Sequence, residues 1–235
     1  MSLISLNMVF WDDGKDDSTR IRNVLYTYPQ LKRLTQYLKD NGVDAVCNLY
    51  DFSPEQKAEE CIWIPFPLSE FRKSEKLNIV IKQQSEHSFF CMFDCDCFID
   101  PLDYPRLLEQ IKGLTAGDIV TYDLAKLGGD VSEYIIDSVF YKDKARWSYA
   151  YSGKMENGPL CGSMGGLGGV FICDSKILNE VGGYDEKYKT WGGEDGDLLD
   201  RIMISKNYKS INSTRDFAPY HLEHFTDWDN KKYKS

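Results

Sequence analysis

Two carboxylates follow an apolar run in the segment 93–97, whose sequence is FDCDC. Alternate residues of a β-strand face the same side, so a strand over residues 89–99 would place Asp94 and Asp96 on one face and the intervening cysteines on the other. Two neighbouring carboxylates repel each other unless a cation joins them. Oxygen ligands suit Mg²⁺ or Mn²⁺, and such an ion would hold a diphosphate. The pattern predicts a divalent-metal site, and the alternative is a polar strand end before the turn at Pro101.

A second group of chemically capable residues lies in the block 182–199, GGYDEKYKTWGGEDGDLL. Its glycines allow the backbone to pass close to a ligand. Trp191 could stack on a sugar ring, and a carboxylate of Glu194 or Asp195 could accept hydroxyl protons. Both acids also lie where a helix is expected to begin, so the structural alternative is that they only interact favourably with the helix dipole.

Two of the three histidines of the chain, His221 and His224, lie in the segment PYHLEH at residues 219–224. A neutral imidazole can complete a metal site that carboxylates begin. Taken alone, a surface histidine usually has no such role, so this feature gains weight only beside the other two.

Alternating strands and helices are expected to position these residues. Such an alternation predicts an α/β fold with a mainly parallel central sheet and helices on both faces, and ligands of such sheets gather at the carboxyl ends of the strands. The expected strands are residues 4–10, 44–50, 61–66, 89–99, 118–122 and 170–173, and the expected helices are residues 28–41, 69–84, 104–112, 175–181 and 194–205.

Composition narrows the classes of function. The chain has 235 residues, enough for one large α/β domain or two small ones, and its net charge of −9 argues against sequence-independent nucleic-acid binding. The seven cysteines are odd in number and several lie in apolar strand-like runs, which indicates reduced thiols and a cytoplasmic setting. The sequence contains no CxxC pair, which argues against a structural zinc site. No apolar run approaches the length of a membrane span and no signal peptide is visible, while peripheral membrane association stays open.

Taken in order, these motifs resemble those of the GT-A glycosyltransferases, and especially the bacterial chondroitin-polymerase-like family 2 enzymes and the Golgi β-galactosyltransferases. Residues 92–96 are similar to the Asp-x-Asp strand of that family, and residues 182–198 to its Gly-Gly-(Tyr/Phe)…Trp-Gly-Gly-Glu-Asp block. Residues 71–78 resemble its helix of basic residues and an Asn. The resemblance implies a GT-A nucleotide-diphospho-sugar transferase fold over residues 1–235, with a donor-binding part at about 1–100 and an acceptor-binding part at about 101–235.

The resemblance also implies a role for individual residues. Asp94 and Asp96 would hold Mn²⁺ or Mg²⁺ and the donor, with His221 as a further metal ligand and His224 as its alternative. Asp195 matches the catalytic base. The other positions that match are donor contacts at Asp51, Phe71 and Lys73, with Asp51 reading the uracil ring, and acceptor contacts at Trp191, Gly193 and Glu194.

The activity that the resemblance implies is an inverting transfer of a hexose or N-acetylhexosamine from a UDP-sugar to a saccharide hydroxyl, as in polysaccharide biosynthesis. The chain departs from the family pattern in the loop 11–14, at Gly196 and in the segment 125–158. Three alternatives stay open: a retaining transferase on the same fold, a non-catalytic sugar-binding module, and a calcium-binding structural domain. The last lacks the oxygen spacing of an EF-hand loop.

Overall fold

The computed structural model describes residues 3–11, 18–66, 72–126, 167–189, 192–214 and 217–222. The predicted site residues Phe71, Trp191 and His224 lie outside these ranges, as does the segment 127–158. The strands of the central sheet are β1 (Ile4–Phe10), β2 (Ala45–Asp51), β3 (Ile62–Trp63), β4 (Phe89–Asp94), β6 (Asp118–Tyr122), β8 (Val170–Asp174) and β9 (Ser210–Thr214).

The helices in the described ranges are α1 (Ser18–Asp40), α2 (Lys73–Gln83), α3 (Tyr104–Gly113), α6 (Ser175–Val181) and α7 (Glu194–Met203), with a 3₁₀ turn, η1 (Pro101–Asp103). A second sheet contains β5 (Cys97–Phe98), β10 (Tyr220–His221) and β7 (Ala125–Lys126), in that spatial order. None of the described helices is long and apolar enough to cross a membrane.

The central sheet has the spatial order β3-β2-β1-β4-β8-β6-β9. Pairing is parallel from β3 to β4 and again between β6 and β9, whereas β8 is antiparallel to both of its neighbours, β4 and β6. The predicted class, an α/β fold with a mainly parallel sheet flanked by helices, is confirmed. The sequence pattern did not indicate that a strand of opposite direction lies inside the sheet.

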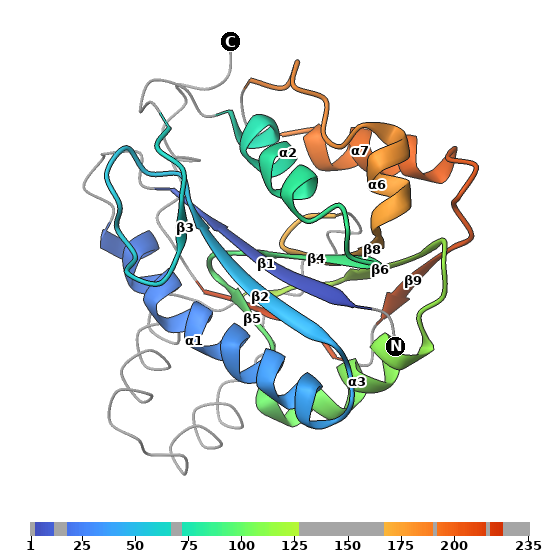
Figure 1. The fold of residues 1–235 in the computed structure, drawn as a ribbon, viewed down its shortest axis with the longest axis horizontal. Coiled ribbons are helices and arrows are strands. Elements are labelled where there is room, and N and C mark those ends of the chain that lie inside the picture. The colour runs from blue at the N-terminus through green and yellow to red at the C-terminus, as the bar shows by residue number, and fades with distance from the viewer. Residues whose placement is uncertain are drawn as a thin grey trace.

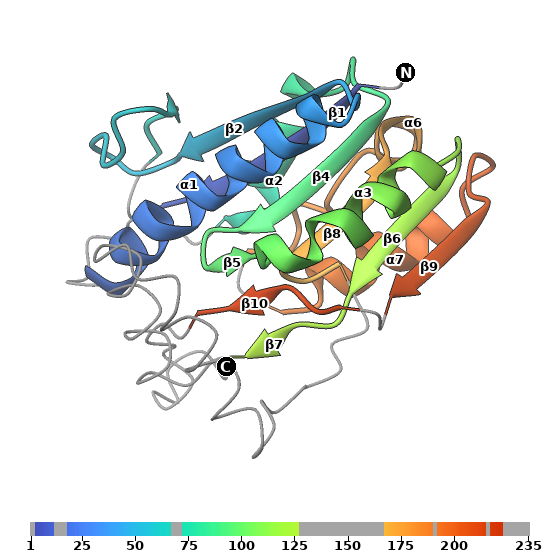
Figure 2. The ribbon, with the colours of Figure 1, turned by 90° about the horizontal axis from the view of Figure 1, so that it is seen from below.

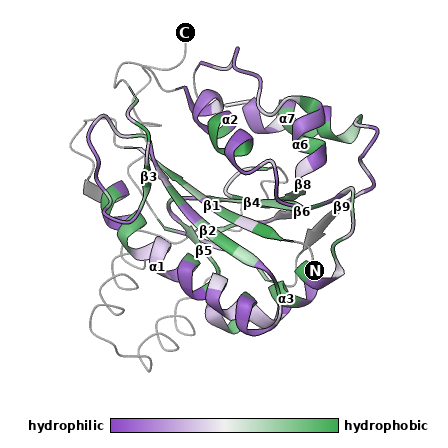
Figure 3. Ribbon diagram, in the orientation of Figure 1, coloured by the Kyte–Doolittle hydropathy of each residue, from purple (hydrophilic) through white to green (hydrophobic). Residues whose placement is uncertain are grey.

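Helices cover both faces of the sheet, with α1 and α3 on one side and α2, α6 and α7 on the other (Figures 1 and 2). The apolar colouring of the strands in Figure 3 reflects this double burial. In β4, Cys91 and Phe93 pack with the α1 and α3 residues, and Phe90 and Met92 pack with those of α2, α6 and α7. The same alternation places Asp94, at the end of β4, on the α2 and α7 side.

Several expected elements differ in their bounds, such as the strand expected at 61–66, which is Ile62–Trp63, and two differ most. Helix α1 begins at Ser18 rather than at residue 28, and it contains Pro29. A proline inside a helix removes one hydrogen bond, but the apolar side chains of Val24, Leu31, Leu34 and Leu38 are buried along both halves of α1, and this packing overrides the cost.

The expected strand over residues 89–99 is also wrong. It ends at Asp94, Cys95 and Asp96 form a turn, and a separate short strand, β5, follows.

Candidate active site

The two carboxylates of the FDCDC segment lie at the carboxyl end of β4, beside the first residues of β8. The backbone N–H of Asp94 donates to the carbonyl of Gly169 at 2.7 Å. The turn that follows is fixed from the opposite face of the sheet, because Thr27 Oγ1 of α1 donates to the Cys95 carbonyl at 2.6 Å. Asp94 and Asp96 therefore approach each other across a turn, and not along one strand face as the period-two pattern predicted.

Strand β10 brings His221 to Asp96. Residue 221 lies opposite Cys97 in the antiparallel pairing of β10 with β5, and the N–H of Leu222 donates to the Asp96 carbonyl at 2.8 Å. In this register Nε2 of His221 lies 3.6 Å from Oδ2 of Asp96. The histidine that the sequence favoured over His224 thus reaches the predicted carboxylate.

Asp94 lies in an acidic environment that Lys73 balances only in part. Burial raises the pKa of Asp94 to about 6; Lys73 opposes this rise, and the carboxylates of Asp96 and Asp195 add to it. In the described ranges, no three His, Cys, Asp or Glu side chains are close enough to hold a metal by themselves. The oxygens of Asp94 and Asp96 and the imidazole of His221 nevertheless fit a divalent cation that phosphate oxygens would also bind.

Lys73, the first residue of α2, forms ion pairs with the acidic start of α7. Its Nζ lies 3.1 Å from Oε1 of Glu194 and 3.3 Å from Oδ2 of Asp195. Burial lowers the pKa of Lys73, but Asp195, Asp94 and Glu194 outweigh this effect and hold the pKa above its ordinary value. The ammonium group stays charged and offsets the negative field of the site.

Glu194 and Asp195 differ in how much of each carboxylate is free. Glu194 is 2% exposed, and its second oxygen, Oε2, accepts from the N–H of Gly192 at 2.7 Å. Asp195 Oδ2 faces Lys73 and the Tyr184 phenol lies against the same carboxylate, whereas the buried Oδ1 accepts no hydrogen bond of normal geometry from any described residue. Glu194 is therefore held as part of the framework, and Asp195 retains an acceptor atom for a ligand.

Gly193 allows the backbone to make the turn that precedes α7. It caps α7 with φ of +88°, in the left-handed region that other residues rarely adopt. A Cβ at this position would lie 3.2 Å from the ring of Tyr188. A glycine is thus needed here for the turn that starts α7 at Glu194.

Asp51, the predicted reader of the uracil ring, is fully buried at the end of β2. Its Oδ1 accepts from the N–H of Ser53 at 2.9 Å, and its Oδ2 accepts from the N–H groups of Lys57 at 2.7 Å and Ala58 at 3.3 Å. In this geometry the carboxylate organises the loop after β2. Contact with a nucleobase stays a prediction for this residue.

Replacing Asp51 by Ala is expected to lower the free energy of unfolding by about 2–4 kcal/mol, because three backbone N–H groups in a partly buried loop lose their acceptor. Urea denaturation measures the change. Asp44→Ala is the control, since Asp44 is exposed, and surface changes usually stay within about 0.5 kcal/mol. If Asp51→Ala lost UDP affinity at unchanged stability, the base contact would be favoured over the loop role.

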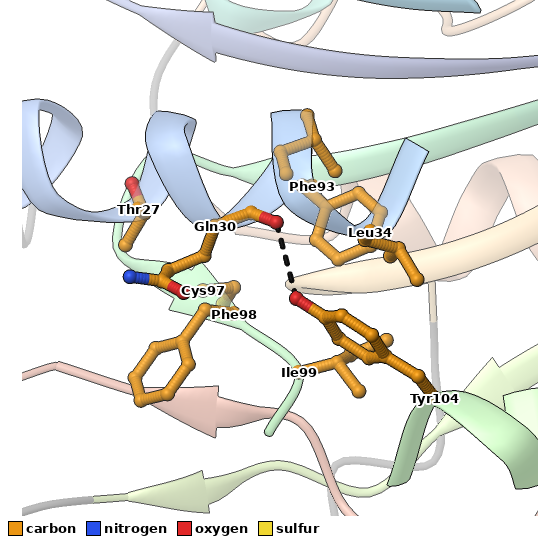
Figure 4. Close-up of a pocket in the computed structure, with 9 residues that line it drawn as sticks. Thr27, Gln30, Leu34, Phe93, Cys97, Phe98, Ile99 and Tyr104 are labelled. Atoms are coloured by element: carbon orange, nitrogen blue, oxygen red, sulfur yellow. Dashed lines mark hydrogen bonds between the residues drawn. The ribbon is translucent and has the colours of Figure 1, made fainter. Parts of the chain in front are cut away.

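A small cavity also lies near this region, between α1, α3 and β5 (Figure 4). Its volume is about 10 Å³, and its lining includes Gln30, Cys97 and Tyr104, whose hydroxyl donates to the Gln30 carbonyl. That volume suits at most about one water molecule. The cavity lies on the α1 side of β4, behind the carboxylates, and is not a nucleotide site.

Among the predicted site residues in the described ranges, the structure brings together Lys73, Asp94, Asp96, Glu194, Asp195 and His221. Asp51 lies two strands away from β4. Two residues next to this cluster had no predicted role: Tyr184, whose buried phenol faces Asp195 and Asp94, and Asn78 of α2, which binds the Tyr184 backbone. Both lie in segments that resemble the family motifs, residues 71–78 and 182–198, but the resemblance gave neither residue a role of its own.

The two histidines give a discriminating pair of variants. His221→Ala is expected to weaken Mn²⁺ binding by at least about tenfold, because it removes the imidazole beside Asp96. His224→Ala is expected to change the affinity by less than about twofold. Isothermal titration of Mn²⁺ in the presence of UDP measures both. The reverse result would assign the ligand to His224, and indifference of both variants would remove histidine from the metal site.

Residues 157–224 match the family model described as the N-terminal domain of galactosyltransferase. No curated protein matches the chain. Drosophila β1,4-galactosyltransferase 7, solved with manganese, UDP-Gal and xylobiose, is similar in structure with a TM-score of 0.57 at 12% identity. That match covers 100% of this chain and 76% of the other chain.

Two further solved structures are similar. Staphylococcus aureus TarS gives a TM-score of 0.59 at 13% identity, over 94% of this chain and 60% of that chain. GalNAc-T7, solved with UDP, GalNAc and Mn²⁺, gives 0.59 at 13% identity, over 97% of this chain and 45% of that chain. The chain thus spans less than two thirds of these two proteins. The agreement over nearly the whole chain shows that its fold is the GT-A fold.

Proposed function

We propose that this chain, a glycosyltransferase with the GT-A fold, is an inverting, divalent-metal-dependent enzyme. It transfers a hexose or N-acetylhexosamine from a UDP-sugar to a hydroxyl of a saccharide acceptor. The donor part is formed by about residues 1–100 and the acceptor part by about residues 101–235. A role in polysaccharide biosynthesis and a cytoplasmic location belong to the same proposal.

One observation carries the proposal: the Asp195 carboxylate lies beside Lys73 and the Tyr184 phenol, and its buried oxygen Oδ1 accepts no hydrogen bond of normal geometry from a described residue. A buried acceptor without a donor costs free energy, so such an atom is a place where a ligand, a water or an ion can supply the hydrogen bond. The first helical turn also keeps the Asp195 side chain fixed at the rim of the carboxylate cluster. A saccharide hydroxyl is a donor of the required kind.

The chemistry follows from these positions. Asp195 Oδ1 accepts the proton of the acceptor hydroxyl as the oxygen attacks the anomeric carbon, and the bond from that carbon to the diphosphate breaks. Lys73 keeps Asp195 and Glu194 oriented and adds positive charge near the departing diphosphate. Asp94, Asp96 and His221 would hold the Mn²⁺ or Mg²⁺ ion, which when bound supplies further positive charge against the leaving group.

The solved galactosyltransferase with manganese, UDP-Gal and xylobiose suggests a first assay for this chain. UDP affinity is measured by calorimetry in Mn²⁺ and in EDTA, and UDP release from UDP-galactose is measured with and without xylobiose. The proposal expects UDP to bind much more weakly in EDTA, because the clustered carboxylates repel a diphosphate. Equal affinity in both buffers would overturn the metal-dependent function.

The assay also separates the alternatives. A retaining transferase would give the product of the opposite anomeric configuration, which NMR of the product resolves. A sugar-binding module would bind saccharide without releasing UDP. The Lys73 ion pairs and the carboxylates at the end of β4 favour a diphosphate site over a lectin site, since a lectin needs no group to hold phosphates.

A further inference from the structure

Helix α2 is tied to the loop between α6 and α7 by the side-chain amide of Asn78. Its Nδ2 donates to the Tyr184 carbonyl at 2.9 Å, and its Oδ1 accepts from the Tyr184 N–H at 2.7 Å. Nδ2 also lies 3.0 Å from Oε1 of Glu186. The amide therefore pairs with the Tyr184 backbone in both directions, as a neighbouring strand would.

The loop is shaped to fit this amide. Gly183 has φ of +71°, and a Cβ at this position would lie 2.4 Å from Oδ1 of Asn78. Gly182 has a similar φ of +76°, but a Cβ there would have no neighbour within 4 Å. The conformation explains glycine at both positions, while the close approach to Asn78 explains it at residue 183 alone.

Helix α7 holds the same loop from its other side. Arg201 Nη1 donates to the carbonyls of Val181 at 2.8 Å and Gly183 at 2.7 Å, and its Nε donates to Asp197 at 2.8 Å. The loop is thus fixed between α2, which begins with Lys73, and α7, which carries Asp195.

Tyr184, the residue that Asn78 binds, lies beside Asp195, the proposed base. The Tyr184 side chain is 3% exposed, and its burial and the nearby carboxylates of Asp195, Asp94 and Glu194 raise its pKa. The phenol therefore packs against the same carboxylate cluster that Lys73 holds. A shift of Tyr184 would leave space beside Asp195 and loosen the Lys73 contact.

We propose that Asn78 is a positioning residue for the transfer step. By clamping Gly183 and Tyr184 to α2, it holds Asp195 at the angle and distance that the acceptor hydroxyl requires. This inference rests on the proposed function, since it needs Asp195 to be the base. A misplacement of about 1 Å in such a group costs on the order of 10²-fold in rate.

The test compares Gly183→Ala with Gly182→Ala, in the assay with UDP-galactose, Mn²⁺ and xylobiose. Both variants force alanine into a positive φ, so both should lower Tm to a similar degree from this cause. Only Gly183→Ala displaces the Asn78 amide. Its kcat per folded molecule should fall by about 10²-fold, with UDP affinity in Mn²⁺ within about twofold, while Gly182→Ala keeps a kcat near that of the wild type.

Asn78→Asp provides a second variant should Gly183→Ala not fold. It keeps the acceptor for the Tyr184 N–H but replaces the donor that faces the Tyr184 carbonyl and Glu186. It should reproduce the loss in kcat at unchanged UDP affinity. A merely structural role would lower Tm in these variants and leave kcat per folded molecule unchanged, which would overturn the inference.

Asp195→Asn is measured in the same assay to separate the two proposals. If Asp195→Asn retains turnover, or the wild type releases no UDP, the proposed function itself fails for this probe and the positioning role fails with it. If Asp195→Asn loses turnover while Asn78→Asp and Gly183→Ala keep it, only the positioning role is overturned.

Discussion

Asp195→Asn is expected to lower kcat by about 10²–10⁴-fold, the usual contribution of a general base. Asparagine keeps the shape of the side chain and can still face Lys73, but it has no carboxylate to accept the acceptor proton. UDP affinity in Mn²⁺ and Tm should change little, because Asp94 and Asp96, the proposed metal ligands, are untouched. Steady-state kinetics with saturating donor, together with thermal unfolding, measure the three quantities on one sample.

Asp200→Asn is the matched control for this change, because Asp200 lies on the same helix and is exposed. If Asp195 only complements the helix dipole, its loss costs about 0.3–1 kcal/mol of stability and turnover is preserved. That pattern, with near-normal kcat in Asp195→Asn, would remove Asp195 from the proposed chemistry.

The second large effect is expected at Asp96. Asp96→Ala should lower UDP affinity in Mn²⁺ by at least about 10²-fold, to the value found in EDTA, since loss even of an outer-shell partner of a metal costs about 10–100-fold. The fold should survive, because the Asp96 carbonyl still accepts from Leu222 and one of two repelling carboxylates is removed. Calorimetry with UDP and Mn²⁺ measures the affinity.

Asp103→Ala serves as the control for Asp96→Ala. Asp103 follows the same turn region but pairs with Arg106 on the surface, so its loss should leave UDP affinity unchanged. An Asp96→Ala protein that binds UDP and Mn²⁺ normally would show that the FDCDC segment is only a strand end. A variant that unfolds would point to the same structural role.

Local patterns in the sequence were sufficient for several elements. The strand at residues 118–122 and the helix at residues 175–181 were predicted at their observed bounds. Buried apolar residues with clear turns on each side define such elements from nearby residues alone. The GT-A fold was implied by the resemblance of the motifs to those of that family, and it is shown by the comparisons.

The parts that sequence reasoning missed depend on contacts between distant residues. Strand β10 has two residues and exists because β5 and β7 flank it. Lys73 meets Glu194 across 121 positions of sequence, and Asn78 meets Tyr184 across 106. A single sequence contains no local signal for such pairs. The sequence therefore indicated the residue types of the site, but not the ion pairs of Lys73 or the hydrogen bonds of Asn78.

The antiparallel strand β8 has a consequence for synthesis of the chain. Strands β4 and β6 do not pair with each other; each pairs with β8, whose residues lie about 50 positions after Tyr122. At about 5–20 residues per second, the ribosome needs roughly 2–10 s to supply this strand. During that interval the nascent chain carries two apolar strand edges without their partner, a state prone to pairing with other chains. We therefore expect chaperone dependence of the nascent protein to peak before residue 170 emerges.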